Sequence, residues 1–85
     1  MRTFEYKIKD EAGIHARPAG LLVKLAKELD SAVTIEKNDK CVDATKLFGV
    51  MGLGVAQGDV VKLTVQDGDE EKSEKLLKEF FEHNL

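Results

Sequence analysis

Residues 13–19 are Gly-Ile-His-Ala-Arg-Pro-Ala, and this stretch locates the start of the first helix. Proline is tolerated in the first turn of a helix, because the N–H that it lacks would have no partner there. Pro18 therefore predicts a helix that begins at His15 or Ala16. Apolar residues follow at helical spacing, which predicts a helix over residues 16–29 with one buried face. The residues expected on that face are Ala16, Ala19, Leu22, Val23, Leu25, Ala26 and Leu29.

Strands and further helices are predicted on either side of this helix. Apolar and charged residues alternate in residues 3–9, where Phe4, Tyr6 and Ile8 share one face, and this alternation is typical of a half-buried strand. Asp69 is a suitable N-cap for an amphipathic helix that follows it. The remaining predicted elements are strands at residues 33–36, 40–44 and 60–66 and helices at residues 47–53 and 70–82.

The order of these elements, β-α-β-β-α-β-α, predicts the fold class. Strands with one apolar face each, together with amphipathic helices, pack as two layers. We therefore predict an α+β, two-layer open-faced sandwich, in which a four-stranded antiparallel sheet is covered on one face by three helices. A length of 85 residues suits a single domain over residues 1–85.

Composition excludes several classes of function. The chain has no apolar run near the ~20 residues of a membrane helix and no signal-peptide pattern, so we expect a cytoplasmic protein without membrane insertion. Cys41 is the single cysteine and cannot form an internal disulfide, and no His/Cys cluster predicts a metal site. A net charge of −3 argues against a nucleic-acid partner.

The residues around His15 favour chemistry on an anion. The first N–H groups of a helix, here those of Ala16 and Arg17, lack helical acceptors, and the helix dipole adds positive charge at that end. The guanidinium of Arg17 has a planar fork that suits phosphate. We therefore expect His15 to be a nucleophilic imidazole that can carry a phosphoryl group. The alternative is that His15 serves only as a cap or surface residue.

Two segments resemble the HPr family, the histidine phosphocarriers of the bacterial sugar phosphotransferase system. Residues 13–19 resemble the active-site motif of that family, and residues 46–55, Lys-Leu-Phe-Gly-Val-Met-Gly-Leu-Gly-Val, resemble its second signature. The resemblance implies that His15 accepts a phosphoryl group on Nδ1 from enzyme I, charged by phosphoenolpyruvate, and delivers it to enzyme II A domains. It also implies that Arg17 stabilises the phosphate. We expect a carrier rather than an enzyme, because partners consume and regenerate His15, and a monomer, because a small shuttle must dock on several partners. No G-x-x-x-x-G-K-[ST] motif is present, so we expect neither ATP use nor any cofactor.

The second signature predicts a docking surface. Leu47, Phe48 and Met51 are spaced so that they can share one face of a short helix, where an exposed apolar patch would bind partners. Lys24 and Lys27 would steer acidic partners toward it. Core packing of the apolar residues and a solvated helix face for the lysines are the alternatives.

Position 46 departs from the resemblance. Many Gram-positive members carry a serine there that a kinase phosphorylates, whereas Lys46 offers no hydroxyl, so we expect no such regulation. Thr45 is predicted instead to be the N-cap of the short helix. Two other interpretations stay open: a paralogue that acts as a regulatory binding module in carbon or nitrogen signalling, and a free domain resembling one within larger phosphotransfer proteins.

Overall fold

The computed structural model describes residues 1–85, and its elements follow the predicted order. They are β1 (Arg2–Lys7), α1 (Ala16–Glu28), β2 (Ala32–Lys37), β3 (Lys40–Asp43), α2 (Leu47–Gly52), β4 (Val60–Gln66) and α3 (Glu70–Asn84). No helix combines the length and the apolar composition that crossing a bilayer requires.

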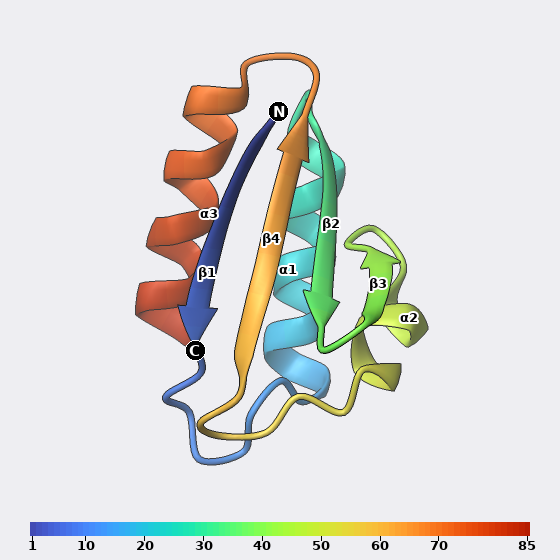
Figure 1. The fold of residues 1–85 in the computed structure, drawn as a ribbon, viewed down its shortest axis with the longest axis vertical. Helices are drawn as coiled ribbons and strands as arrows, with labels where there is room; N and C mark the ends of the chain where they lie inside the picture. The colour runs from blue at the N-terminus through green and yellow to red at the C-terminus, as the bar shows by residue number, and fades with distance from the viewer.

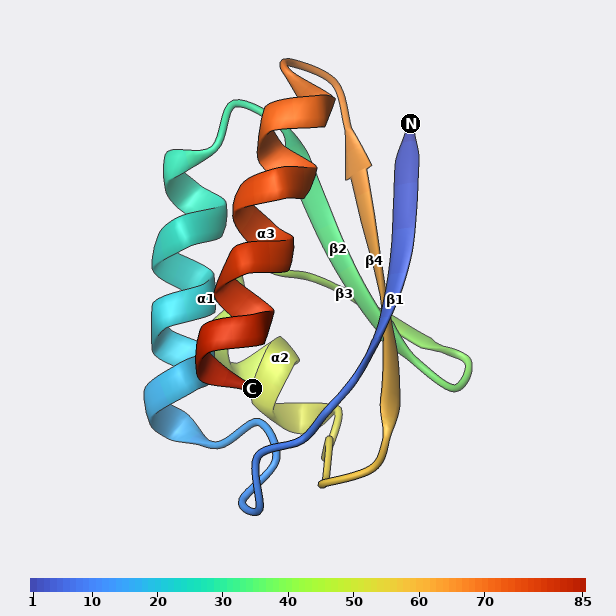
Figure 2. The same cartoon turned by 90° about the vertical axis from the view of Figure 1, so that its left-hand side faces the viewer.

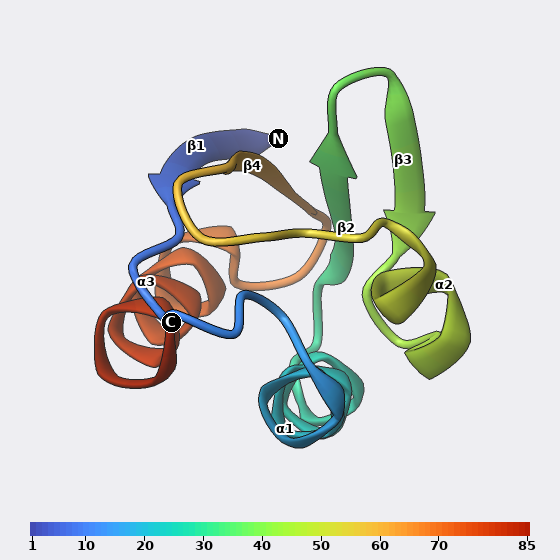
Figure 3. The same cartoon turned by 90° about the horizontal axis from the view of Figure 1, so that it is seen from below.

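The strands form one four-stranded sheet in the order β1-β4-β2-β3, and every neighbouring pair is antiparallel (Figure 1). The register places Leu63 of β4 between Phe4 of β1 and Ile35 of β2. The helices lie on one face of this sheet, α1 and α3 side by side and α2 near β3 (Figures 2 and 3). The predicted α+β sandwich is confirmed.

The core lies between the sheet and the helices. Along β4 the inward residues Val61, Leu63 and Val65 are fully buried, as the alternation requires. Phe81 of α3 is also fully buried, and its ring centroid lies 5.3 Å from that of Tyr6. This packing fixes α3, and with it the end of the chain, against the sheet.

Two sequence-based expectations were wrong in detail. Ala16 is exposed, because it occupies the first position of α1, at the open end of the helix. Thr45 is not the N-cap of α2. Lys46 holds that position, and the Thr45 hydroxyl donates instead to Asp43 Oδ1 at 2.7 Å. The side chain thus closes a local turn with the carboxylate two residues earlier, a partner that competes with capping.

Three carboxylates are held in their ionised form by hydrogen bonds. The hydroxyl and the N–H of Thr45 lower the pKa of Asp43. The N–H of Ala56 is the main cause that lowers the pKa of Asp59, and the chain's amino group is the main cause that lowers the pKa of Glu70. Each carboxylate therefore binds its proton less readily in the folded state than in the unfolded chain.

We expect the free energy of unfolding to be maintained above the ordinary carboxylate pKa of about 4 and to fall as the pH drops through the lowered values. Stability falls in acid because protonation of a carboxylate weakens the hydrogen bonds that it accepts only in the folded state. Urea denaturation between pH 7 and pH 2.5 measures this slope. The triple variant Asp43→Asn, Asp59→Asn, Glu70→Gln should show a flatter slope, and an unchanged slope would contradict the assignment.

Candidate functional site

His15 lies at the N-terminal end of α1, as predicted. It is the N-cap residue, with extended backbone angles (φ −106°, ψ −174°), and its carbonyl accepts the N–H of Ala19 at 2.9 Å. The imidazole makes no capping hydrogen bond and is exposed. The N–H groups of Ala16 and Arg17 lie in the first turn, where no helical acceptor precedes them. An anion on the ring would therefore meet free donors.

The loop before His15 is held by its own hydrogen bonds. Asp10 Oδ1 accepts the N–H of Ala12 at 2.8 Å, and the carbonyl of Asp10 accepts the N–H of Gly13 at 2.9 Å. Gly13 has φ +67°, and a Cβ there would collide with the carbonyl of Val55. Only glycine fits this close approach without strain.

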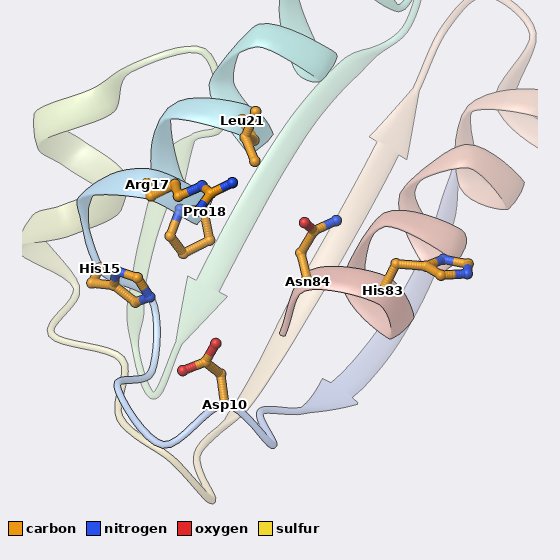
Figure 4. A pocket seen from close by; sticks show the side chains of 7 residues that line it. All are labelled: Asp10, His15, Arg17, Pro18, Leu21, His83 and Asn84. Carbon is orange, nitrogen blue, oxygen red and sulfur yellow. The ribbon is translucent and has the colours of Figure 1, made fainter.

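A shallow pocket of about 230 Å³ opens beside His15. Its walls include Arg17 and Leu21 from α1, Asp10 from the preceding loop and Asn84 from the end of α3 (Figure 4). The pocket brings together the two predicted residues, His15 and Arg17. Its lining is mostly polar and combines the basic side chain of Arg17 with the carboxylate of Asp10.

Sequence reasoning missed the far wall of this pocket. Asp10 lies in the loop before His15, whereas Asn84 is far from His15 along the chain. The packing of α3 brings Asn84 to the same pocket. Leu21 carried a usable signal, because it is a leucine outside the buried stripe of α1, and it is 42% exposed. His83 also borders the pocket, but its Nδ1 contacts the carbonyl of Glu79 at 2.6 Å and its ring points away (Figure 4).

The three apolar residues singled out on α2 are exposed on its surface and form what we call the apolar patch: Leu47, Phe48 and Met51. Phe48 is 86% exposed, and Leu47 and Met51 are each 37% exposed, whereas Val50 of the same helix is fully buried. Core packing therefore accounts for Val50 and not for Phe48. Helix α2 packs against α1.

Exposed basic side chains lie on α1, the helix against which α2 packs, and at the start of α2. Lys24 and Lys27 are exposed on α1, and Lys46 is exposed at the N-cap of α2 without a capping bond. None of the three forms an ion pair within the chain, so their charges are available to an outside partner.

The chain offers no cluster of three or more metal-ligating side chains. Cys41 is a free, exposed thiol on β3.

Comparison with known proteins places this geometry in a family. The family model described as the PTS HPr component phosphorylation site matches residues 2–83. HPr-C-His from Thermoanaerobacter tengcongensis is 43% identical, with 96% of this chain and 92% of that chain covered and a TM-score of 0.91. HPr from Bacillus anthracis is 28% identical, with 94% and 95% covered and a TM-score of 0.87.

A third related structure is that of a protein whose name refers to catabolite repression. Crh, the catabolite repression protein of Bacillus subtilis, was solved as a dimer with a swapped domain; it is 32% identical, with 94% of this chain and 92% of that chain covered and a TM-score of 0.77. Because the family match spans nearly the whole sequence and the likeness to solved HPr structures is close, the chain belongs to the HPr family of phosphocarrier proteins.

Proposed function

We propose that this chain carries a phosphoryl group on His15, taken from phosphoenolpyruvate-charged enzyme I and passed to enzyme II A domains in sugar uptake. The observation that carries the proposal is the exposed imidazole at the N-cap of α1, beside Arg17 and the unpaired N–H groups of the first turn. Membership of the HPr family supports the same role.

The transfer step follows from this geometry. An imidazole nitrogen of His15, Nδ1 by the family resemblance, attacks the phosphorus of a phosphohistidine donor. The bond from phosphorus to the donor's imidazole nitrogen breaks in the same step. The negative oxygens of the transferring group are then stabilised by Arg17 and by the N–H groups of Ala16 and Arg17. These preorganised donors favour both the acceptance and the release of the phosphoryl group, because the same negative oxygens need stabilisation in both transfers.

The apolar patch, together with Lys24 and Lys27, is proposed to dock both partners. Leu47, Phe48 and Met51 supply apolar contact, and methionine adapts to differently shaped surfaces. Lys24 and Lys27 steer acidic partners, which raises the association rate at low ionic strength.

Replacing Phe48 with alanine is expected to lower kcat/KM for transfer from enzyme I by about tenfold, because large exposed aromatic anchors dominate binding energy. The free energy of unfolding should change by less than about 0.5 kcal/mol, since the side chain is mostly exposed. Quenched-flow transfer assays measure the first effect and urea denaturation the second. Val60→Ala is the matched control: Val60 is 49% exposed but lies on β4, away from α2. Equal rates for Phe48→Ala and wild type would contradict the docking role.

We propose no kinase regulation at Lys46. The neighbouring hydroxyl, that of Thr45, is engaged by Asp43 and stands before the helix rather than at its cap. A kinase with ATP should therefore add no phosphate to residues 45 and 46.

Residues 1–85 are proposed to act as one cytosolic carrier domain. We propose a monomer, because one apolar patch must meet enzyme I and the acceptor domains in turn. An HPr dimer from Thermoanaerobacter tengcongensis and the Crh dimer are solved structures of related chains. Light scattering at the concentrations used for transfer tests this point.

Likeness to Crh favours a second candidate function, a regulatory binding module. Transfer from the phosphorylated chain to purified A domains of sugar-specific enzymes II separates the two. Delivery of the phosphoryl group within seconds supports the carrier function. A chain that accepts phosphate but delivers none to any A domain would instead favour the regulatory module.

A further inference from the structure

A lysine at the end of β2 stands where an apolar residue is expected. Lys37 continues the inward-facing row of Val33 and Ile35, which are both buried. A charge in such a row needs partners. Its Nζ donates to the carbonyl of Gly54 at 2.8 Å and lies 2.9 Å from Asp59 Oδ2. We call these three residues the Lys37 clamp. The lysine side chain is only 20% exposed, so solvent screens this contact less than an open surface pair.

The clamp closes the loop between α2 and β4. Gly54 is the second residue of that loop and Asp59 is its last, and Asp59 Oδ2 also accepts the N–H of Ala56 at 2.8 Å. The N–H of Asp59 returns a bond to the carbonyl of Ala56 at 3.0 Å. One ammonium group thus joins both ends of a loop that already folds back on itself.

The middle of this loop supports the backbone that leads into His15. The N–H of Ile14 donates to the carbonyl of Val55 at 3.1 Å, and both side chains are buried. Gly13 sits so close to the carbonyl of Val55 that no Cβ fits between them. Both loops lie at the same end of the molecule (Figure 1). A shift of Val55 therefore has to move the residues directly before the imidazole.

We propose that Lys37 is a positioning residue for phosphoryl transfer: by bridging Gly54 and Asp59, it fixes the loop on which the backbone before His15 rests. The inference rests on the proposed carrier function and adds a residue that touches neither the imidazole nor Arg17. A small displacement of a reacting group lowers the rate of transfer strongly, even when the change lies far from the chemistry.

The test compares Lys37→Met, which keeps the length of the side chain and removes its charge, with Lys40→Met. Lys40 faces Lys37 across the β2–β3 hairpin and makes no ion pair, so it is the matched control. Lys37→Arg, which restores two donors, tests rescue, and Asp59→Asn removes the other charge. Two quantities are measured: the saturating rate of transfer from phosphorylated enzyme I, and hydrogen exchange of the Ile14 amide by NMR.

We expect Lys37→Met to slow saturating transfer by about tenfold and to speed exchange at Ile14 by a similar factor. Lys37→Arg should recover most of both, and Lys40→Met should change neither. Asp59→Asn should act in the same direction, and adding it to Lys37→Met should cost little more, because the two groups share one contact.

Two failures are distinguishable. If wild type accepts no phosphoryl group, the proposed function falls, and this inference with it. If wild type is active and Lys37→Met transfers at the wild-type rate, the positioning role alone is overturned. Lower stability of Lys37→Met with unchanged transfer would likewise overturn it, since that is the signature of a purely structural ion pair.

Discussion

Replacing Arg17 with alanine is expected to slow phosphoryl transfer to and from His15 by about 10²- to 10³-fold, the range found when one preorganised donor to a developing negative charge is removed. Arg17 is exposed in the first turn of α1 and forms no ion pair within the chain, so its loss leaves the fold unstrained. Rapid-quench transfer from enzyme I measures the rate directly.

The conservative variant Arg17→Lys sharpens this prediction. Lysine keeps the positive charge but lacks the planar fork, so we expect it to recover only part of the lost rate. The free energy of unfolding of both variants should stay within about 0.5 kcal/mol of wild type. A rate for Arg17→Ala within threefold of wild type would show that the guanidinium does not stabilise the transferring group.

Replacing Phe81 with alanine is expected to lower the free energy of unfolding by about 3–5 kcal/mol, because a fully buried aromatic side chain is lost and a cavity remains. Phe81 also packs against the rings of Phe4, Tyr6 and Phe80. Domains are stable by only about 5–15 kcal/mol, so this is a large share of the total.

Urea denaturation at pH 7 measures this loss, and Phe48→Ala is the control. The two phenylalanines differ in burial, fully buried against 86% exposed, rather than in chemistry. A loss below about 1 kcal/mol for Phe81→Ala, or an equal loss for both variants, would contradict the position of Phe81 in the core.

The fold was predictable from the sequence because the spacing of apolar residues agrees with the residues that begin and end helices and strands. Pro18 located the start of α1 within a residue, and alternation in residues 60–66 located β4. Burial of one face of each element then leaves a layered sheet and helices as the stable arrangement. These signals are local, so one sequence suffices to detect them.

The rest of the site depends on contacts between distant segments. Asn84 reaches the pocket only because Phe81 seats α3 on the sheet, and no pattern near residue 84 signals this. A hydroxyl at residue 45 predicts a helix cap, because hydroxyls commonly cap helices, but Asp43 offers this side chain a local partner.

Lys37 is a different case, because its signal was present in the sequence. Residues 33, 35 and 37 share one face of β2. The first two are apolar and the third is charged. A charge that interrupts an inward-facing row indicates a tertiary partner, although it does not say which one. The structure supplies the partners, Gly54 and Asp59.

The most direct test of the carrier function is phosphorylation of the chain itself. The protein is mixed with enzyme I, Mg²⁺ and phosphoenolpyruvate, and is followed by intact mass and ³¹P NMR beside a His15→Ala variant. We predict one acid-labile phosphoryl group on the wild type, with the signal of a phosphohistidine, and none on the variant. An unmodified wild type beside an enzyme I that charges another HPr, or a phosphoryl group that persists on His15→Ala, would contradict the account.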